Sequence, residues 1–311
     1  MTSLASIAVK VQRGERLSES DALFLFESQD LLEIGELAAL ANSRLNGSRV
    51  FYNVNRHINY SNICVNRCRY CAFRRDPDQD GAYLMRLEDI RSRAEEALNQ
   101  GATEIHMVGG LHPDLPFPVY CAMLRTIRDL SPTLHLKAFT AVEIDHFCRI
   151  SGLPAREVLL RLKEAGLDSL PGGGAEIFAP AVRIELCGDK ISGDRWLEIM
   201  REAHNCGLRS NATILYGHLE SYADRVDHLA RLRDLQDRTG GFQALVPLPF
   251  QPDNTVLGAG LKKPAGGVDD LKTIAVARLF LDNFDHIKAY WVLLGEKVAQ
   301  VALAFGANDL D

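Results

Sequence analysis

The 311-residue chain has no run of about 18 consecutive apolar residues, and its first residues do not join a basic segment to an apolar one. These absences predict neither a membrane span nor a signal peptide. Basic residues are not in excess either, since the net charge is −6 with both signs interspersed, so no basic stripe points to nucleic acid. With 47% hydrophobic and 24% charged residues, we expect a soluble cytoplasmic enzyme with a small-molecule substrate.

Cysteine is scarce, and its odd count of seven argues against a disulfide framework in a chain without an export signal. Four cysteines are scattered, and we interpret them as packing residues. Cys64, Cys68 and Cys71 instead form a C-x3-C-x2-C run within one polar loop. A structural zinc site needs four ligands, and ferredoxin-type clusters take four cysteines at other spacings. The triplet therefore predicts a cubane iron–sulfur cluster whose fourth iron is open to a substrate.

Two kinds of pattern divide the chain. In residues 1 to about 55 apolar residues recur at helical spacing, which predicts a helical N-terminal extension (1–55). From 56 to 311, short apolar or β-branched runs alternate with amphipathic segments such as 154–165. The predicted strands are 56–63, 104–108, 135–140, 168–170, 210–215, 242–248 and 287–294.

Strand–helix alternation of this kind favours an α/β fold with a parallel sheet. Residues 56–311 number 256, close to the ~250 of a TIM-type (β/α)8 barrel. A doubly wound open sheet is the alternative. We prefer the barrel because the candidate functional residues follow strand ends, where barrels place their active sites. The chain ends where an eighth strand would begin, so closure of the barrel is left open.

The cysteine triplet, with the aromatic Tyr70 just before its last member, resembles the signature of the radical S-adenosylmethionine (SAM) enzymes. The resemblance implies a [4Fe-4S] cluster on the three cysteines and SAM at the open iron. It also implies that the backbone around Phe73 lies against the adenine ring, and that Gly109 and Gly110 meet the methionyl amino group. Two glycines would let the backbone approach a ligand closely.

Polar residues near other strand ends are further candidates. Glu176 and Arg183 follow the triple glycine at 172–174, and we interpret them as a ribose-hydroxyl acceptor and a partner for the methionyl carboxylate. An ordinary solvated arginine is the alternative for Arg183. Asn211 and Thr213 share one face of the fifth strand, where burial without a partner is costly, so we expect them to face a ligand.

Four polar residues are candidates for a catalytic role, and His218, Lys137 and Glu143 among them could take part in acid–base catalysis. His218 could donate a proton at neutral pH, although a structural histidine in a loop is an equal alternative. Lys137 and Glu143, with Thr140, are similar candidates on the third strand and just after it. Nothing in the sequence ranks them.

Longer tracts carry a narrower resemblance. They resemble the aminofutalosine synthases of the futalosine route to menaquinone, whose relatives are the dehypoxanthine futalosine cyclases and the deazaflavin synthases of coenzyme F420 assembly. The tracts are 57–64, 138–144, 171–178, 211–218 and 249–255.

This resemblance implies that a 5′-deoxyadenosyl radical adds to 3-[(1-carboxyvinyl)oxy]benzoate, with aryl migration and loss of carbon dioxide, to give 6-amino-6-deoxyfutalosine. It also implies an electron donor such as flavodoxin or ferredoxin. A dianionic substrate needs cations or donors, which Lys137, Arg183, Arg209 or His218 could supply. The alternatives are the cyclase, the deazaflavin synthase and, in a different class, a non-catalytic iron–sulfur protein.

Overall fold

Parallel strands form the frame of the molecule, and the computed structural model describes residues 2–260 and 265–310. Within these residues the strands are β1 (Phe51–Tyr52), β2 (Asn55–Asn59), β3 (Glu104–Val108), β4 (His135–Ala138), β5 (Ser169–Leu170), β6 (Arg209–Tyr216), β7 (Phe242–Pro249), β8 (His286–Ala289) and β9 (Asp309–Leu310). From β2 to β9 the order across the sheet follows the order along the chain. A doubly wound sheet would reverse that order at a switch point, so this alternative is excluded.

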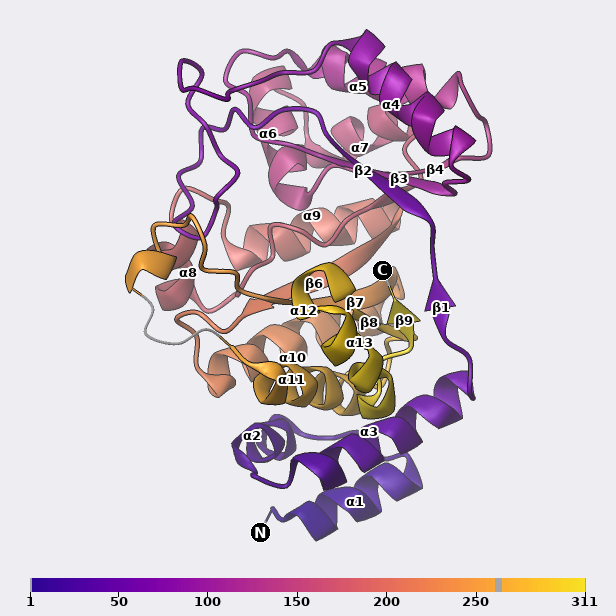
Figure 1. Cartoon of the computed structure of the whole chain (residues 1–311), viewed down its shortest axis with the longest axis vertical. Helices are drawn as coiled ribbons and strands as arrows, with labels where there is room; N and C mark the ends of the chain where they lie inside the picture. Colours follow the sequence, from indigo (N-terminus) through magenta and orange to yellow (C-terminus); the bar gives the residue numbers. More distant parts are fainter. Residues whose placement is uncertain (1, 261–264, 311) are drawn as a thin grey trace.

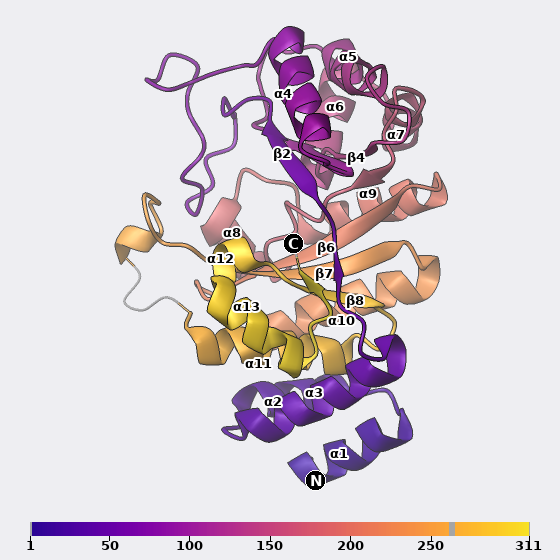
Figure 2. The same cartoon turned by 45° about the vertical axis from the view of Figure 1, so that its right-hand side comes forward.

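The first strand closes the barrel. β1 and β2 lie on one segment and are separated only by Asn53 and Val54. β1 pairs with β9, and β2 pairs with β3, so this segment joins both ends of the strand order. It runs as one ribbon along the side of the molecule (Figures 1 and 2). The eighth strand that the sequence left open is β9, and the predicted (β/α)8 architecture is confirmed.

Helices separate successive strands and cover the outside of the barrel (Figure 1). They are α4 (Leu87–Asn99), α5 (Phe117–Arg128), α6 (Ala141–Ser151), α7 (Ala155–Glu164), α8 (Pro180–Cys187), α9 (Gly193–Asn205), α10 (Tyr222–Thr239), α11 (Gly267–Phe280), α12 (Trp291–Leu294) and α13 (Glu296–Ala302), with 3-10 turns η1 (Gly258–Gly260) and η2 (Leu303–Phe305). The helix predicted at 154–165 is α7, with Pro154 at its N-cap.

Three helices precede the barrel, α1 (Leu4–Arg13), α2 (Glu19–Glu27) and α3 (Leu31–Asn46), and α2 and α3 pack against its outer helices α10 and α11. α3 lies against α11 and η2 (Figure 2), and Gly35 faces the Phe305 ring. The helical prediction for the first segment holds up to Asn46. It fails beyond that point, because residues 51–52 form β1 and β2 already begins at Asn55. The division into domains at 55/56 stays a prediction.

Three strands end earlier than predicted. β2 ends at Asn59 rather than at 63, and two further strands end early because the chain turns. β8 ends at Ala289, and Tyr290 is the N-cap of α12, so the expected strand at 287–294 is half helix. β4 ends at Ala138 rather than at 140, since Phe139 has a positive φ of 61°, which a strand cannot accommodate.

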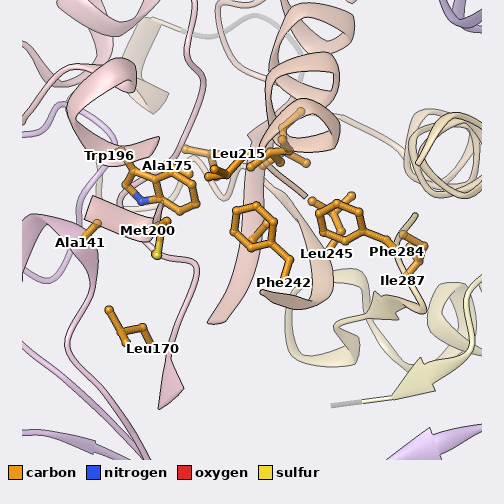
Figure 3. Packing of buried hydrophobic residues seen from close by; sticks show 14 of the residues in the cluster. Ala141, Leu170, Ala175, Trp196, Met200, Leu215, Phe242, Leu245, Phe284 and Ile287 are labelled. Carbon is orange, nitrogen blue, oxygen red and sulfur yellow. The ribbon is translucent and has the colours of Figure 1, made fainter. Parts of the chain in front are cut away.

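The core lies between the outer face of the strands and the helices. Ile105 and Met107 of β3 are buried in it, whereas their neighbours Glu104 and His106 lie on the opposite, inner face. Trp196, Phe242 and Phe284 form a stacked aromatic series in this core (Figure 3). Because the strands bury their apolar faces outward, against the helices, their polar faces point into the barrel. A barrel whose interior is filled by layers of bulky apolar side chains would not have such a polar inner face. Among residues 2–260 and 265–310, no helix has both the length and the apolar character needed to cross a membrane.

Candidate active site

The three cysteines of the triplet line one cavity. They lie in the loop between β2 and α4, and none of them forms a disulfide. The cavity has a volume of about 180 Å³. It is lined by Asn62, Cys64, Asn66, Cys68, Tyr70, Cys71, Phe73, Arg74, Val108, Gly109, Gly110, Leu111, Thr140, Val142, Glu143, Gly174 and Lys190. The structure thus brings the triplet together with the predicted residues Phe73, Gly109, Gly110 and Glu143.

The cysteines suit a cluster better than a single ion. In the described part of the chain, no three His, Cys, Asp or Glu side chains converge closely enough to hold one metal ion. In a cubane cluster each cysteine binds a different iron at a separate corner, so the thiolates stand further apart than around zinc. Three free thiols on one cavity wall fit such a cluster.

The glycine pair lets the end of β3 pack against the cysteine loop. A Cβ on Gly109 would lie 2.6 Å from the Tyr60 ring, and one on Gly110 would lie 2.2 Å from the Ile63 carbonyl oxygen. The sequence pointed to close approach of a ligand as the reason for these glycines. The structure adds close approach of the protein itself, and it places both residues on the cavity wall.

Glu143 ties three segments together at the same wall. Its Oε1 accepts hydrogen bonds from the Tyr60 hydroxyl (2.7 Å) and the Gly109 N–H (3.1 Å), and its Oε2 accepts one from the Thr140 N–H (2.7 Å). Burial raises the pKa of this carboxyl, and the hydrogen bonds oppose that rise. Glu143 therefore organises the cavity wall, and a role in proton transfer stays a prediction.

A buried polar network stands beside Cys68. The Tyr70 hydroxyl donates to Glu176 Oε1 (2.5 Å), and Lys190 Nζ donates to the same carboxylate oxygen and to the Tyr70 oxygen (2.5 Å each). Burial tends to raise the pKa of Glu176, but the Lys190 charge and these bonds hold it below its usual value. Glu176 also has a φ of 48°, a backbone strain that often accompanies functional sites.

Lys190 is the residue of this network that sequence reasoning missed. It lies in the turn between α8 and α9, where no periodicity or motif marks it. Burial raises the pKa of the Cys68 thiol to about 12, and the charge of Lys190 is the main influence that opposes this rise. Only the fold reveals this proximity.

Arg183 does not reach the cavity with free donors. Its guanidinium donates to the backbone carbonyls of Ala175 (2.6 Å), Ile177 (3.2 Å), Gly174 (2.9 Å) and Ile191 (2.8 Å). The side chain is buried and holds the loop that carries Glu176. These bonds contradict the predicted contact with a methionyl carboxylate, and also the solvated alternative.

The inner face of the barrel is polar and carries two buried lysines. Lys137 on β4 pairs with Glu104 on β3 (2.8 Å), and Lys288 on β8 pairs with Asp309 on β9 (2.9 Å). Burial, together with the nearby charges of His57 and of these two lysines, lowers the pKa of His106 well below its usual value. Both ammonium groups therefore lie near one imidazole on the inner face.

The polar pair on β6 lies on this inner face as predicted. Asn211 and Thr213 alternate with Ala212 and Ile214, which belong to the apolar core. Both polar residues are buried, and the Thr213 hydroxyl donates to the Gly172 carbonyl (2.7 Å). That bond satisfies Thr213 within the protein, so its ligand contact stays a prediction.

Two other candidates are placed away from the cavity. The His218 ring is fully buried beyond β6, where Nε2 contacts the Leu215 carbonyl (3.0 Å) and Nδ1 accepts from the Leu219 N–H (2.6 Å). This geometry matches the structural alternative for His218. Arg209 is the exposed first residue of β6, at the opposite end of the barrel from the strand carboxyl ends, so it cannot supply a cation at the mouth.

Comparison with known families agrees with this geometry. The family model described as the radical SAM superfamily matches residues 58–232, more than half of the chain, and contains the cysteine loop. The chain belongs to the radical SAM superfamily. Enzymes of this superfamily use a [4Fe-4S] cluster and SAM. A second model, the CofH/MqnC C-terminal region, matches residues 239–311.

Two relatives of this radical SAM chain are similar over nearly its whole length. Aminodeoxyfutalosine synthase of Thermus thermophilus is 46% identical over 310 residues, covering 99% of this chain and 83% of the relative. A 5-amino-6-(D-ribitylamino)uracil–L-tyrosine 4-hydroxyphenyl transferase of Methanoculleus marisnigri is 45% identical over 312 residues, covering 99% and 85%. Methylornithine synthase (PylB) shares the fold, with a TM-score of 0.77 at 20% identity over 98% of this chain and 85% of that one.

Proposed function

We propose that this radical SAM enzyme is an aminofutalosine synthase, which joins the adenosyl group of SAM to 3-[(1-carboxyvinyl)oxy]benzoate to give 6-amino-6-deoxyfutalosine. The observation that carries the proposal is the 46% identity to aminodeoxyfutalosine synthase across 99% of the chain. The cavity supports the radical SAM part of it, because the cysteine triplet and the glycine pair share one wall.

Specific residues would hold the two cofactors. Cys64, Cys68 and Cys71 would bind the cluster, with Gly109 and Gly110 beside the methionyl moiety of SAM. When bound, the cluster supplies the electron that cleaves SAM to methionine and a 5′-deoxyadenosyl radical. Glu176 Oε1 is engaged by Tyr70 and Lys190, so a contact with the ribose hydroxyls would fall to its Oε2.

The inner face would bind the substrate. The benzoate and enolpyruvyl carboxylates make the substrate a dianion, and charged donors bind carboxylates most strongly. Lys137 and Lys288 each place a buried ammonium group on this face, beside Glu104 and Asp309 respectively. Asn211 would add an amide donor on the same face. We infer a cytoplasmic location and a small electron carrier such as flavodoxin or ferredoxin as the reductant.

A second candidate has its own support. The 45% identity to the 4-hydroxyphenyl transferase covers 99% of the chain and nearly equals the first similarity. Such an enzyme would join the hydroxyphenyl group of L-tyrosine to 5-amino-6-(D-ribitylamino)uracil. Its substrates carry no benzoate, so the two candidates differ in the products they form.

One experiment separates these candidates and the non-catalytic alternative. Anaerobically reconstituted, reduced protein is incubated with SAM labelled in its adenosyl carbons and, in separate reactions, with the enolpyruvyl benzoate, with the tyrosine and uracil pair, or with dehypoxanthine futalosine. We expect mass spectrometry to find the label in a product that contains the benzoate ring. A hydroxyphenyl–uracil product with the second pair would establish the other candidate. Label found only in free deoxyadenosine while dehypoxanthine futalosine is consumed would establish the cyclase, and intact SAM in every reaction would indicate a non-catalytic protein.

A further inference from the structure

The middle of the cysteine loop is held by the last turn of α8 and by the segment that follows it. The Arg67 N–H donates to Asp189 Oδ2 (2.9 Å), and the Arg69 N–H donates to the Leu186 carbonyl (3.0 Å). Residues 67–69 are not part of a helix or strand, so their backbone N–H groups have no partners from regular secondary structure. The two hydrogen bonds supply such partners. They bring Lys190, the residue after Asp189, against the loop.

Lys190 also contacts the loop directly, through the side chain of Tyr70, which lies between two of the predicted ligands in the sequence. Tyr70 lies between Cys68 and Cys71, and its hydroxyl accepts from Lys190 Nζ while donating to Glu176. The Tyr70 hydroxyl therefore donates its single proton to one partner and accepts a hydrogen bond from another. These two bonds fix the position of the hydroxyl group. Lys190 Nζ also lies 5.1 Å from the centroid of the Tyr70 ring.

Lys190 also belongs to the lining of the cavity that would hold the cluster. Its side chain is only 13% exposed and lines the same cavity as Cys68 and Cys71. A charge in such a weakly screened place acts on its neighbours much more strongly than a charge in water. Tyr70 also lines the cavity, and Glu176 binds both of these residues.

We propose that Lys190 is a positioning residue for the iron–sulfur cluster: it fixes the cysteine loop through Tyr70, and its positive charge favours the reduced state of the cluster. The inference rests on the cluster assignment in the proposed function. One-electron reduction adds a negative charge to a cluster that three thiolates already make anionic. A fixed cation beside it stabilises the more negative state and therefore raises the midpoint potential.

The test compares three single variants after anaerobic reconstitution. Lys190→Met removes the charge at similar length, and Lys190→Arg keeps it. Lys163→Met is the matched control, because Lys163 donates to the Cys206 carbonyl (2.7 Å) outside the cavity. Iron content is measured first, and the midpoint potential is then measured by titration with dithionite as the electron source, followed by electron paramagnetic resonance without substrate.

We expect Lys190→Met to bind iron and to have, at the wild-type midpoint, a ratio of reduced to oxidised cluster about tenfold lower, which corresponds to a downward shift of about 59 mV for one electron. Lys190→Arg should recover most of the shift, and Lys163→Met should match the wild type. Because Lys190→Met leaves Glu176 buried without its partner, the pair Glu176→Gln and Glu176→Gln/Lys190→Met repeats the comparison without that carboxylate. The potential should again fall on removing the lysine.

Equal potentials within both pairs overturn the proposal. Two of the variants carry Lys190→Met, alone or together with Glu176→Gln. Loss of iron from these two at an unchanged melting temperature, with iron retained in Lys190→Arg, supports the role of Lys190 in fixing the loop. Loss of iron together with unfolding in all three Lys190 variants shows a purely structural lysine and overturns it. Failure of the wild type itself to bind four irons would instead refute the cluster assignment, and a potential shift with an unexpected product would refute only the substrate.

Discussion

At the scale of single residues, the cavity wall is built from side chains that have protein partners of their own. Glu143 accepts three hydrogen bonds, and Lys190 donates to Glu176 and Tyr70. Buried polar groups need such partners, because an unpaired one costs about 1–3 kcal/mol. The three cysteines of the loop differ from these residues, since their free thiols line the cavity and can serve as ligands.

Cysteine substitution should therefore separate ligands from packing residues. Cys68→Ala should abolish the cluster absorbance and product formation, because a cluster held by two thiolates would be lost. Cys148→Ser should keep its iron and lose about 1–3 kcal/mol of stability at most, as expected for a polar group in a partly buried place. Iron per chain is the deciding measurement, and retained iron with activity in Cys68→Ala would disprove the ligand assignment.

Glu176→Gln should show a pH-dependent loss of stability. The carboxyl has a folded-state pKa below its ordinary value of 4.5, mainly because Lys190 outweighs the effect of burial. A depressed pKa stabilises the fold at pH values above 4.5, and this contribution disappears as the pH falls through the folded-state pKa. Urea unfolding at pH 7 should show a loss of about 3–5 kcal/mol from breaking the buried pair.

The difference between wild type and Glu176→Gln should then shrink below pH 4.5. A gap of constant size from pH 7 to pH 4 would mean that the Glu176 charge does not stabilise the fold. The same variant should weaken SAM binding by about 1.5–3 kcal/mol if Glu176 also accepts the ribose hydroxyls. An unchanged dissociation constant would leave Glu176 with the structural role alone.

At the scale of elements, the cavity depends on how closely the end of β3 approaches the cysteine loop. The Gly110 N–H donates to the Ser61 carbonyl (2.8 Å), and the Val65 N–H donates to the Leu111 carbonyl (3.0 Å). These bonds hold the loop and the strand end at backbone distance on both sides of Cys64. A side chain inserted between them has no space.

Gly110→Ala should therefore separate the two elements. The new methyl group would meet the Ile63 backbone at 2.2 Å, and such overpacking costs about 1–3 kcal/mol. We expect lower iron uptake and a lower melting temperature. Gly267→Ala is the matched control, because its nearest atom, on Val298, would lie 3.6 Å away. Equal iron uptake by both variants would show that the close approach is not needed.

At the scale of the whole molecule, the N-terminal helices are packed as part of one body with the barrel. Leu25, Phe26 and Ile34 are fully buried, and Lys272 of α11 donates to the carbonyls of Phe26 (3.0 Å) and Ser28 (2.7 Å). The first strand also depends on the C-terminal part of the barrel, because β1 pairs with β9, which lies more than 250 residues later in the chain. We therefore expect the stability of the barrel to depend on the N-terminal helices and on the pairing between its first and last strands.

Removal of residues 2–46 should destabilise the barrel. Each buried Leu, Ile or Phe side chain contributes about 1.5–3 kcal/mol, so the loss should reach several kcal/mol. Thermal unfolding followed by circular dichroism should show a clearly lower midpoint than that of the full chain. A truncated chain with the melting temperature of the full chain would instead support an independent extension at 1–55.

The sequence by itself determined the local features of this protein. β3 lies at 104–108 as its short apolar run predicts, α7 is the helix predicted near 154–165, and the cysteine triplet forms one loop. These features depend on residues within a few positions of one another, and spacing along the chain fixes such neighbours. For the same reason the glycine pair could be placed at a strand end.

Only the tertiary structure decided which charged side chain meets which partner. Arg183 and Lys190 lie seven residues apart, yet the fold places the arginine against backbone carbonyls and the lysine in the cavity lining. His218 is buried and satisfied, whereas Lys288 lies on the inner face beside Asp309. Long-range packing brings these partners together from distant parts of the chain, and local sequence patterns contain no record of such distances.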